Sequence, residues 1–98
     1  MLKSKQNILN NIKQDFTIKD LENISGIKAH TIRIWEQRYE LLKPKRTDTN
    51  IRYYDEEQLK YLLNVSLLIE NGFRISQICS FSEGEFNQQI RDLMEDAY

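Results

Sequence analysis

The chain has 98 residues, of which 40% are hydrophobic and 30% are charged, a composition typical of one small globular domain rather than a disordered chain. Its single cysteine excludes an internal disulfide. No apolar stretch approaches the roughly 20 residues of a membrane span, and residues 1–7 lack the apolar stretch of a secretory signal, so we expect a cytoplasmic protein with no membrane partner.

Charge is distributed unevenly along this sequence, although the net charge is only −1. Residues 28–54 hold seven basic and three acidic residues, whereas residues 55–98 hold three basic and nine acidic residues. A domain with one positive face is oriented by a polyanion. An ordinary mixed surface is the alternative reading of these counts.

The first part of the chain is predicted to contain an extension and a helix. Residues 1–15 are expected to be flexible or weakly helical, because isolated helices this short are marginal in water. A helix is expected over residues 17–25, since Thr17 and Asp20 have the spacing of a capping box and Gly26 tolerates a tight left-handed turn. The apolar residues predicted to form its buried face are Ile18, Leu21 and Ile24.

A second helix is predicted over residues 28–39, directly after the glycine turn. At 100° per residue, the side chains expected to pack inward are Ile32, Trp35 and Tyr39. The side chains expected on the opposite face are His30, Arg33 and Gln37, with Ile34 beside them. Arginine can donate two hydrogen bonds to guanine and glutamine can pair with adenine, so this face suits base edges in DNA. The helix taken alone leaves a solvated polar face as an equal alternative.

A basic β-hairpin is predicted over residues 43–54, with its turn at Asp48-Thr49-Asn50. The cations that project from it are Lys45, Arg46 and Arg52. Tyr53 and Tyr54 are expected to supply one ring to the core and one hydroxyl to a phosphate. Exposed ion pairs contribute little, typically ~0–1 kcal/mol each, so phosphate neutralisation explains these cations better than stability does.

Two helices are expected after the hairpin. Asp55 and Gln58 form a second capping-box pattern, which predicts a long core helix that ends at Asn71-Gly72. A short helix is predicted over residues 75–80. Arg74 precedes it at the tip of a second projection, where it either reaches a phosphate or is a solvated loop residue.

A last helix is predicted to begin after Ser82, which forms a third capping-box pattern with Glu85, and to run to about Ala97. The apolar residues along one stripe of this helix are Phe86, Ile90, Leu93 and Met94. The helix either docks on the domain or begins a linker to an effector or dimerisation region.

The order of these elements resembles the N-terminal domain of MerR-type transcription regulators. The motifs that carry the resemblance are Phe16-Thr17-Ile18-Lys19-Asp20-Leu21, Thr31-Ile32-Arg33-Ile34-Trp35-Glu36-Gln37-Arg38-Tyr39, Arg52-Tyr53-Tyr54 and Glu70-Asn71-Gly72-Phe73-Arg74-Ile75-Ser76-Gln77-Ile78. The second motif is most similar to the branch that contains the cobalamin-binding CarH and LitR regulators. The resemblance implies a mainly α fold with a small β-hairpin: a winged helix-turn-helix domain of about four core helices over residues 16–80, plus a C-terminal helix over residues 81–98.

The resemblance also implies a sequence-specific DNA-binding domain, with helix 28–39 in the major groove and the wing 43–54 on the backbone. Members of the family bind pseudo-palindromic operators as dimers, and many distort promoter DNA. The implied partners are double-stranded DNA, a second copy in a full-length regulator and, indirectly, RNA polymerase. The residues expected to contact DNA are Thr17, His30, Thr31, Arg33, Trp35, Gln37, Arg38, Lys45, Arg46, Arg52, Tyr53 and Arg74.

Two positions depart from the family pattern. Asp48-Thr49-Asn50-Ile51 replaces a Pro-Gly-Gly-type turn followed by His, although Asn50 can adopt the left-handed conformation. Lys28 stands where a Ser or Thr cap is common, which weakens the cap of the second helix. We expect an isolated DNA-binding domain or a fragment of a longer regulator, with no cofactor in this chain; cobalamin would need an additional domain.

Three functions are alternatives to a DNA-binding transcription regulator. An enzyme is not expected, because the one His and the one Cys are far apart and no metal-spaced ligand set or Gly-rich phosphate loop occurs. A small architectural DNA-binding protein, similar to an excisionase, would use the same winged helix without an effector domain. A protein-interaction module would use the apolar stripe of the last helix to pair with a partner helix.

Overall fold

A computed structural model describes residues 15–96, which form five helices and one two-stranded antiparallel sheet. The elements are α2 (Ile18–Ser25), α3 (Ala29–Tyr39), β1 (Lys45–Arg46), β2 (Arg52–Tyr53), α4 (Glu56–Glu70), α5 (Ile75–Ser80) and α6 (Glu83–Asp96). The mainly helical fold with a small hairpin is therefore confirmed. The extension expected over residues 1–15 lies, except for Asp15, outside the described residues.

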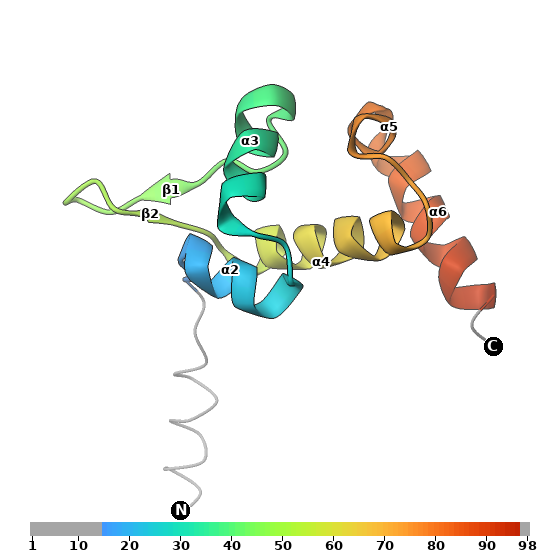
Figure 1. The fold of residues 1–98 in the computed structure, drawn as a ribbon, viewed down its shortest axis with the longest axis horizontal. Coiled ribbons are helices and arrows are strands. Elements are labelled where there is room, and N and C mark those ends of the chain that lie inside the picture. The colour runs from blue at the N-terminus through green and yellow to red at the C-terminus, as the bar shows by residue number, and fades with distance from the viewer. Residues whose placement is uncertain (1–14, 97–98) are drawn as a thin grey trace, which may run out of the picture.

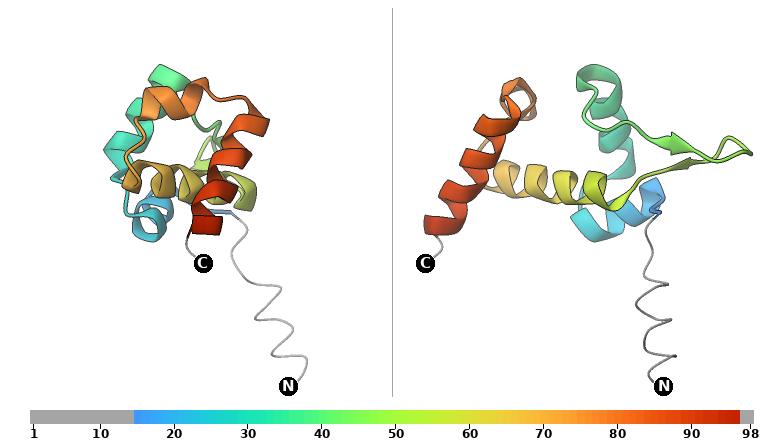
Figure 2. Two further views of the ribbon diagram at one scale, coloured as in Figure 1. Left: turned by 90° about the vertical axis from the view of Figure 1, so that its right-hand side faces the viewer. Right: turned by 180° about the vertical axis from the view of Figure 1, so that it is seen from behind.

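Helix α4 is the axis of the arrangement. In Figures 1 and 2, α3 and α5 lie on the same side of α4 at its two ends, and the hairpin extends away beyond α3. α2 packs against both α3 and α4, while α5 and α6 pack against the other part of α4. The molecule thus presents two projections on one side of a central helix.

Capping boxes start three of the helices, as their sequence spacing predicts. The three pairs are Thr17 with Asp20, Asp55 with Gln58, and Ser82 with Glu85. Before α2, the Thr17 hydroxyl accepts a hydrogen bond from the backbone N–H of Asp20 at 3.1 Å, and the Asp20 carboxylate accepts from the N–H of Thr17 at 2.9 Å. Each box satisfies backbone donors that a helix start leaves unpaired.

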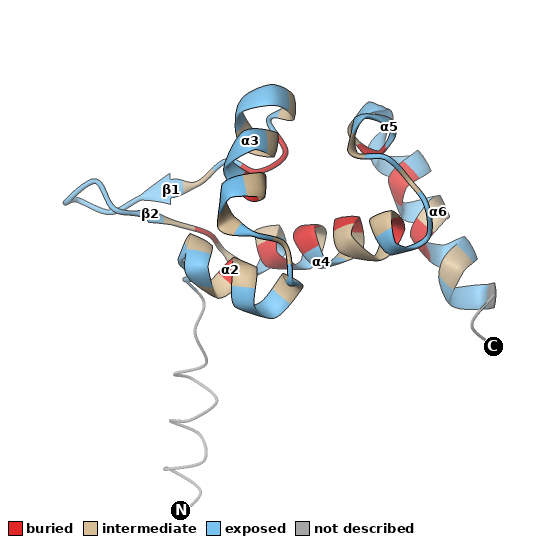
Figure 3. Ribbon diagram, in the orientation of Figure 1, coloured by how far each residue is buried: buried red, intermediate tan, exposed pale blue. Residues whose placement is uncertain are grey.

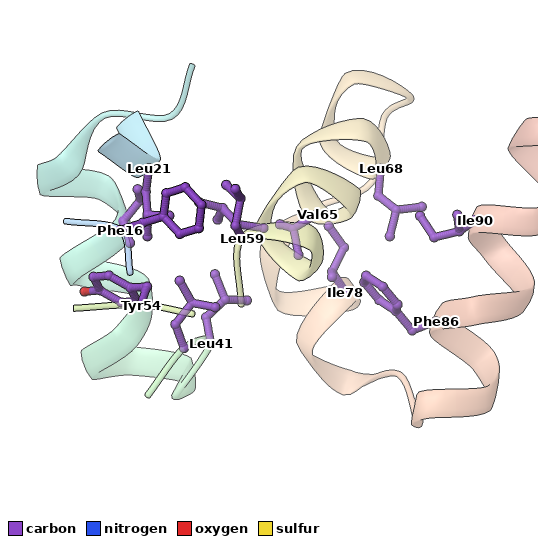
Figure 4. Packing of buried hydrophobic residues seen from close by; sticks show 13 residues of the cluster. Phe16, Leu21, Leu41, Tyr54, Leu59, Val65, Leu68, Ile78, Phe86 and Ile90 are labelled. Carbon is purple, nitrogen blue, oxygen red and sulfur yellow. The ribbon is translucent and has the colours of Figure 1, made fainter. Parts of the chain in front are cut away.

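The hydrophobic core runs along α4 in two parts (Figure 4). The buried residues at the α3 end are Phe16, Leu21, Ile32, Leu41, Leu42, Tyr54 and Leu59. The buried residues at the α5–α6 end are Leu68, Ile78, Phe86 and Ile90. Buried positions recur along α4 between these parts, whereas the hairpin tip is exposed (Figure 3). The hairpin is joined to this core at its base, where Phe16 and Tyr54 exchange two backbone hydrogen bonds of 2.7 Å.

Helix α6 is docked on the domain through part of its apolar stripe. Phe86 and Ile90 are each only 7% exposed, and the centre of the Phe86 ring lies 4.8 Å from the centre of the Tyr61 ring on α4. The interpretation that this stripe is offered to a partner helix is therefore wrong for Phe86 and Ile90. Met94, which is 52% exposed, lies outside the packed part.

The buried face predicted for α2 is wrong at one of its three positions. Leu21 is fully buried and Ile18 is half-buried, but Ile24 is 49% exposed. Three residues cover 300° of a helix, so a spacing of three drifts by 60° at each step. By its third member, the series has turned away from the face that packs against α3 and α4.

Candidate nucleic-acid interface

The start of α3 is held by a side chain from α2. Lys28 occupies the N-cap position and makes no side-chain cap, as its residue type predicts. Instead, the Glu22 carboxylate accepts a hydrogen bond of 2.8 Å from the backbone N–H of Ala29, the first residue of α3. This hydrogen bond lowers the pKa of Glu22. The acceptor lies seven residues before its donor, a separation that matches no local capping pattern.

The outer face of α3 has the composition predicted from its phase. His30, Arg33 and Gln37 are exposed, whereas Ile32 on the inner side is fully buried. Ile34 beside the polar group is 37% exposed. Two other candidates of α3, Thr31 and Trp35, are half-buried, and Trp35 packs against the core.

The two strands of the wing sort their side chains onto two faces. Arg46 lies opposite Arg52, and Lys45 lies opposite Tyr53. Because successive side chains in a strand point to opposite faces, the two arginines share one face, and Lys45 shares the other with Tyr53. The predicted cations of the wing therefore do not form one continuous patch.

Lys45 is tied to the body of the domain. Its ammonium nitrogen lies 3.1 Å from a carboxylate oxygen of Asp55, the N-cap of α4. The hydrogen bond and charge of Asp55 raise the pKa of Lys45. The pKa of Asp55 is lowered, first by the backbone N–H of Gln58 and then by Lys45. This contact joins the base of the wing to the start of α4.

The tip of the wing is a short, well-bonded loop. Asn50 has a φ of 65°, which confirms the left-handed conformation predicted for it. The N–H of Asn50 donates to the carbonyl of Thr47 at 2.8 Å, and the N–H of Ile51 donates to the Thr47 hydroxyl at 3.1 Å. The Arg46 guanidinium lies 3.3 Å from both the backbone and the side-chain oxygen of Asn50.

A recess of about 520 Å³ lies between α3 and the arginine face of the wing. The residues that line it are Arg33, Glu36, Gln37, Glu40, Leu42, Lys43, Pro44, Arg46 and Arg52. It thus brings together two predicted base readers of α3 and two predicted phosphate contacts of the wing. The hydroxyl of buried Tyr54 donates to the Glu36 carboxylate at 2.7 Å and links the wing base to α3. Burial, followed by this hydrogen bond, raises the pKa of Tyr54.

The remaining candidates lie apart from this recess. Thr17 is exposed at the start of α2, where its hydroxyl serves the capping box. The Arg38 guanidinium lies 5.8 Å from the centre of the Tyr39 ring. Arg74 is exposed at the start of α5, at the other end of α4. Within residues 15–96, neither Arg38 nor Arg74 forms an ion pair.

The described residues also bear on two other kinds of site, a metal centre and a membrane span. No group of three or more His, Cys, Asp or Glu side chains in residues 15–96 is arranged to hold a metal ion. None of the helices in that range combines the length and apolar character needed to cross a membrane.

Two helices joined by a glycine turn, followed by a basic hairpin and packed on a third helix, define a winged helix-turn-helix protein. The model of the MerR HTH family regulatory proteins matches residues 16–83. The chain belongs to this family.

The relatives include regulators and one enzyme. HTH-type transcriptional regulator MlrA of Salmonella typhimurium strain LT2 is 28% identical over 74 residues, which cover 76% of this chain and 30% of MlrA. HTH-type transcriptional repressor CarH of Myxococcus xanthus is 29% identical over 65 residues, covering 66% of this chain and 22% of CarH. Type II methyltransferase M.Eco47II of Escherichia coli is 28% identical over 64 residues, covering 65% of this chain and 15% of the enzyme. The chain thus spans less than a third of each of these relatives.

Solved structures confirm the winged helix-turn-helix fold. A MerR family transcriptional regulator from Bacillus cereus matches with a TM-score of 0.61 and 19% identity, covering 85% of this chain and 66% of the other. HiNmlR, a MerR family regulator that lacks the sensor domain and is bound to promoter DNA, matches with a TM-score of 0.52 and 18% identity, covering 82% and 55%.

Proposed function

We propose that residues 16–80 form the sequence-specific, double-stranded-DNA-binding domain of a transcriptional regulator, with α3 in the major groove and the wing on the sugar-phosphate backbone. The observation that carries this proposal is the recess between α3 and the wing. Its walls combine Arg33 and Gln37, which can read base edges, with Arg46 and Arg52, which can neutralise phosphates. HiNmlR, which shares the fold, is bound to promoter DNA in its structure.

The placement of Arg46 and Arg52 supports an anionic partner. The two residues are directly opposite each other on one face of the ribbon. Like charges in such cross-strand pairs are destabilising. Neither arginine forms an ion pair with a carboxylate of residues 15–96, so within the described chain their repulsion is offset only by the two neutral oxygens of Asn50 that accept from Arg46. A phosphate between them does so, and it draws the ribbon onto a DNA strand.

The roles of the other candidates follow from their positions. His30 and Arg33 face the bases, with Thr31, Trp35 and Arg38 at the flanks of α3. The residues assigned to phosphates outside the recess are Thr17, Lys45, Tyr53 and Arg74. Lys45 contacts DNA from the second face of the ribbon while it holds Asp55. Because α3 and α5 lie on the same side of α4, Arg74 reaches the same duplex at a distance from the wing (Figure 1).

The assembled regulator is a homodimer that binds two half-sites and acts on RNA polymerase indirectly. One copy of a winged helix reads only a few base pairs, and the second half-site supplies the missing affinity. The domain itself is not catalytic and needs no cofactor. The MlrA and CarH matches favour a regulator over the enzyme represented by M.Eco47II. A DNA-binding role also fits the expected cytoplasmic location.

Selection from a randomised duplex library tests this proposal. The wild-type chain is expected to enrich one sequence. Arg33→Ala should lose base preference at one position, at about 1–3 kcal/mol or roughly 5- to 150-fold. Arg52→Ala should weaken binding to all duplexes and reduce the slope of log K against log salt by about 1.

Arg91→Ala is the matched control, because Arg91 is an exposed arginine of α6 whose only bonding partner among residues 15–96 is Gln88 of its own helix. It should change neither preference nor slope. Equal effects of Arg33→Ala and Arg91→Ala, or a wild-type chain that enriches no sequence, would overturn the assignment.

A further inference from the structure

Glu40 occupies a backbone conformation that disfavours its side chain. It follows the last residue of α3 with φ 53° and ψ 37°, in the left-handed region. Its N–H donates to the carbonyl of Glu36 at 3.0 Å, and the next N–H, of Leu41, donates to the carbonyl of Trp35 at 3.5 Å. The bond from Glu40 to Glu36 is that of an αL C-cap, where glycine is the usual residue because other L-residues are strained there. Burial of Leu41 and Leu42 fixes the turn, so the chain cannot relax away from it.

The charge of Glu40 is also unfavourable at this position. The last carbonyls of a helix carry partial negative charge, and a carboxylate at this end is repelled. The other carboxylate of the recess, Glu36, accepts a hydrogen bond from Tyr54. Glu40 forms neither an ion pair nor a side-chain hydrogen bond with any of residues 15–96. Its side chain therefore has no stabilising role in the described fold that would explain its presence.

The location of Glu40 suggests a different role. It is exposed and lines the recess with Arg33, Arg46 and Arg52. Three guanidinium groups without carboxylate partners would attract the phosphates of any duplex, because phosphate contacts carry no sequence information. A fixed negative charge among them repels phosphates that enter the recess in a wrong register.

We infer that Glu40 is a specificity-determining residue of the proposed DNA-binding surface, and that its carboxylate disfavours complexes with unrelated duplexes more than the complex with the preferred sequence. This inference rests on the proposed function. In the preferred complex, the base contacts of α3 hold the phosphates away from Glu40. Complexes with other duplexes are held by phosphate contacts alone, so the DNA backbone enters the recess and its phosphates approach the Glu40 carboxylate.

Glu40→Gln tests the charge while keeping the shape and the strained backbone. Two probes are used with the 98-residue chain: the duplex enriched by the wild-type protein from a randomised library, and a shuffled duplex of the same length and composition. Glu40→Gln should tighten binding to the shuffled duplex by about 3- to 10-fold and change binding to the enriched duplex by less than about 2-fold. Glu40→Gly should lose the same discrimination and, by relieving the strain, raise Tm by roughly 4–8 °C.

Glu95→Gln is the matched control, since Glu95 is likewise an exposed glutamate near the C-terminal end of a helix, but of α6. It should alter neither affinity. Equal tightening on both probes, no change on either, or a selective loss of binding to the enriched duplex would each overturn the inference. If the wild-type chain itself does not distinguish the two duplexes, both the proposed function and the inference about Glu40 are overturned. A wild-type chain that distinguishes them and a Glu40→Gln variant that does so equally well would overturn the role of Glu40 alone.

Discussion

At one end of α4, Ile32 of α3 is fully buried and the exposed side chains around it are largely cationic. At the other end, Ile78 of α5 is 1% exposed, and the exposed acids of α6 are Glu83, Glu85, Asp92 and Glu95. Each end is thus packed around a buried isoleucine. The two ends differ in how their exposed polar side chains are paired. On α6, Gln88 bonds to Asp92 at 2.8 Å and Arg91 bonds to Gln88 at the same distance.

At the α3 end, Arg33, Arg46 and Arg52 line one recess, and none of the three forms an ion pair within residues 15–96. Surface polar groups that satisfy one another serve the solubility and stability of the domain. Like-charged side chains that lie together without carboxylate partners destabilise the fold, so their presence favours a role in binding an anionic ligand. The difference between the two ends therefore supports the proposal that the α3 end binds DNA.

The packing half of this comparison is tested by truncating its two anchors. Ile32→Ala and Ile78→Ala should each destabilise the domain by about 2–5 kcal/mol, because each removes most of a buried side chain and leaves a cavity. Urea unfolding followed by circular dichroism measures both. Exposed Ile34→Ala is the control and should change stability by less than about 0.5 kcal/mol. A large decrease in the free energy of unfolding for only one of these two variants would show that the ends are not packed alike.

The link between the wing and α3 is tested by Tyr54→Phe. The ring stays buried, but the hydrogen bond to Glu36 is lost, at about 1.5–3 kcal/mol for a bond to a charged group. Tyr61→Phe is the matched control at the other end of α4, since the Tyr61 hydroxyl makes no hydrogen bond within residues 15–96. If both variants unfold at the same urea concentration as the wild type, the hydroxyl of Tyr54 does not hold the wing on α3.

A smaller effect is expected at the start of α3 from Glu22→Gln. The amide still offers an oxygen to the Ala29 N–H but loses the charge that favours a helix N-terminus. The folded pKa of Glu22 is lowered below its ordinary value of 4.5, so its stabilisation is present above that pH and is lost as pH falls through the folded pKa.

Urea midpoints of wild type and Glu22→Gln should therefore differ at neutral pH and converge in acid, as pH falls through the folded pKa of Glu22. Glu70→Gln, a change of an exposed glutamate at the C-terminal end of α4, is the control, because a carboxylate there lies far from a helix N-terminus. A difference between wild type and Glu22→Gln that persists unchanged in acid would show that the charge of Glu22 does not act on α3.

Local signals explain why much of the fold was predictable. The capping pairs at Thr17, Asp55 and Ser82 act over three residues, and each one marks the start of its helix correctly. The phase of α3 was predictable because a single apolar stripe on a short helix leaves one choice of inner face. The exposure of His30, Arg33 and Gln37 followed from that choice.

Features that depend on contacts distant in sequence were not predictable. The Glu22–Ala29 hydrogen bond requires the angle between α2 and α3, and the division of the wing's cations requires the register that sets Lys45 opposite Tyr53. The left-handed turn at Glu40 is imposed by the burial of the two leucines after it, whereas its own residue type argues against that conformation. Tertiary packing overrides local preference at these places.

The most direct measurement is a map of backbone amide chemical shifts of the 98-residue chain, recorded by NMR during titration with the enriched duplex. The largest changes are predicted over residues 30–37 of α3 and 46–52 of the wing, with a separate change at Arg74 and little change over residues 85–95 of α6. Changes concentrated on α6, with α3 and the wing unaffected, would contradict the assignment of the cationic end of α4 as the one that binds DNA.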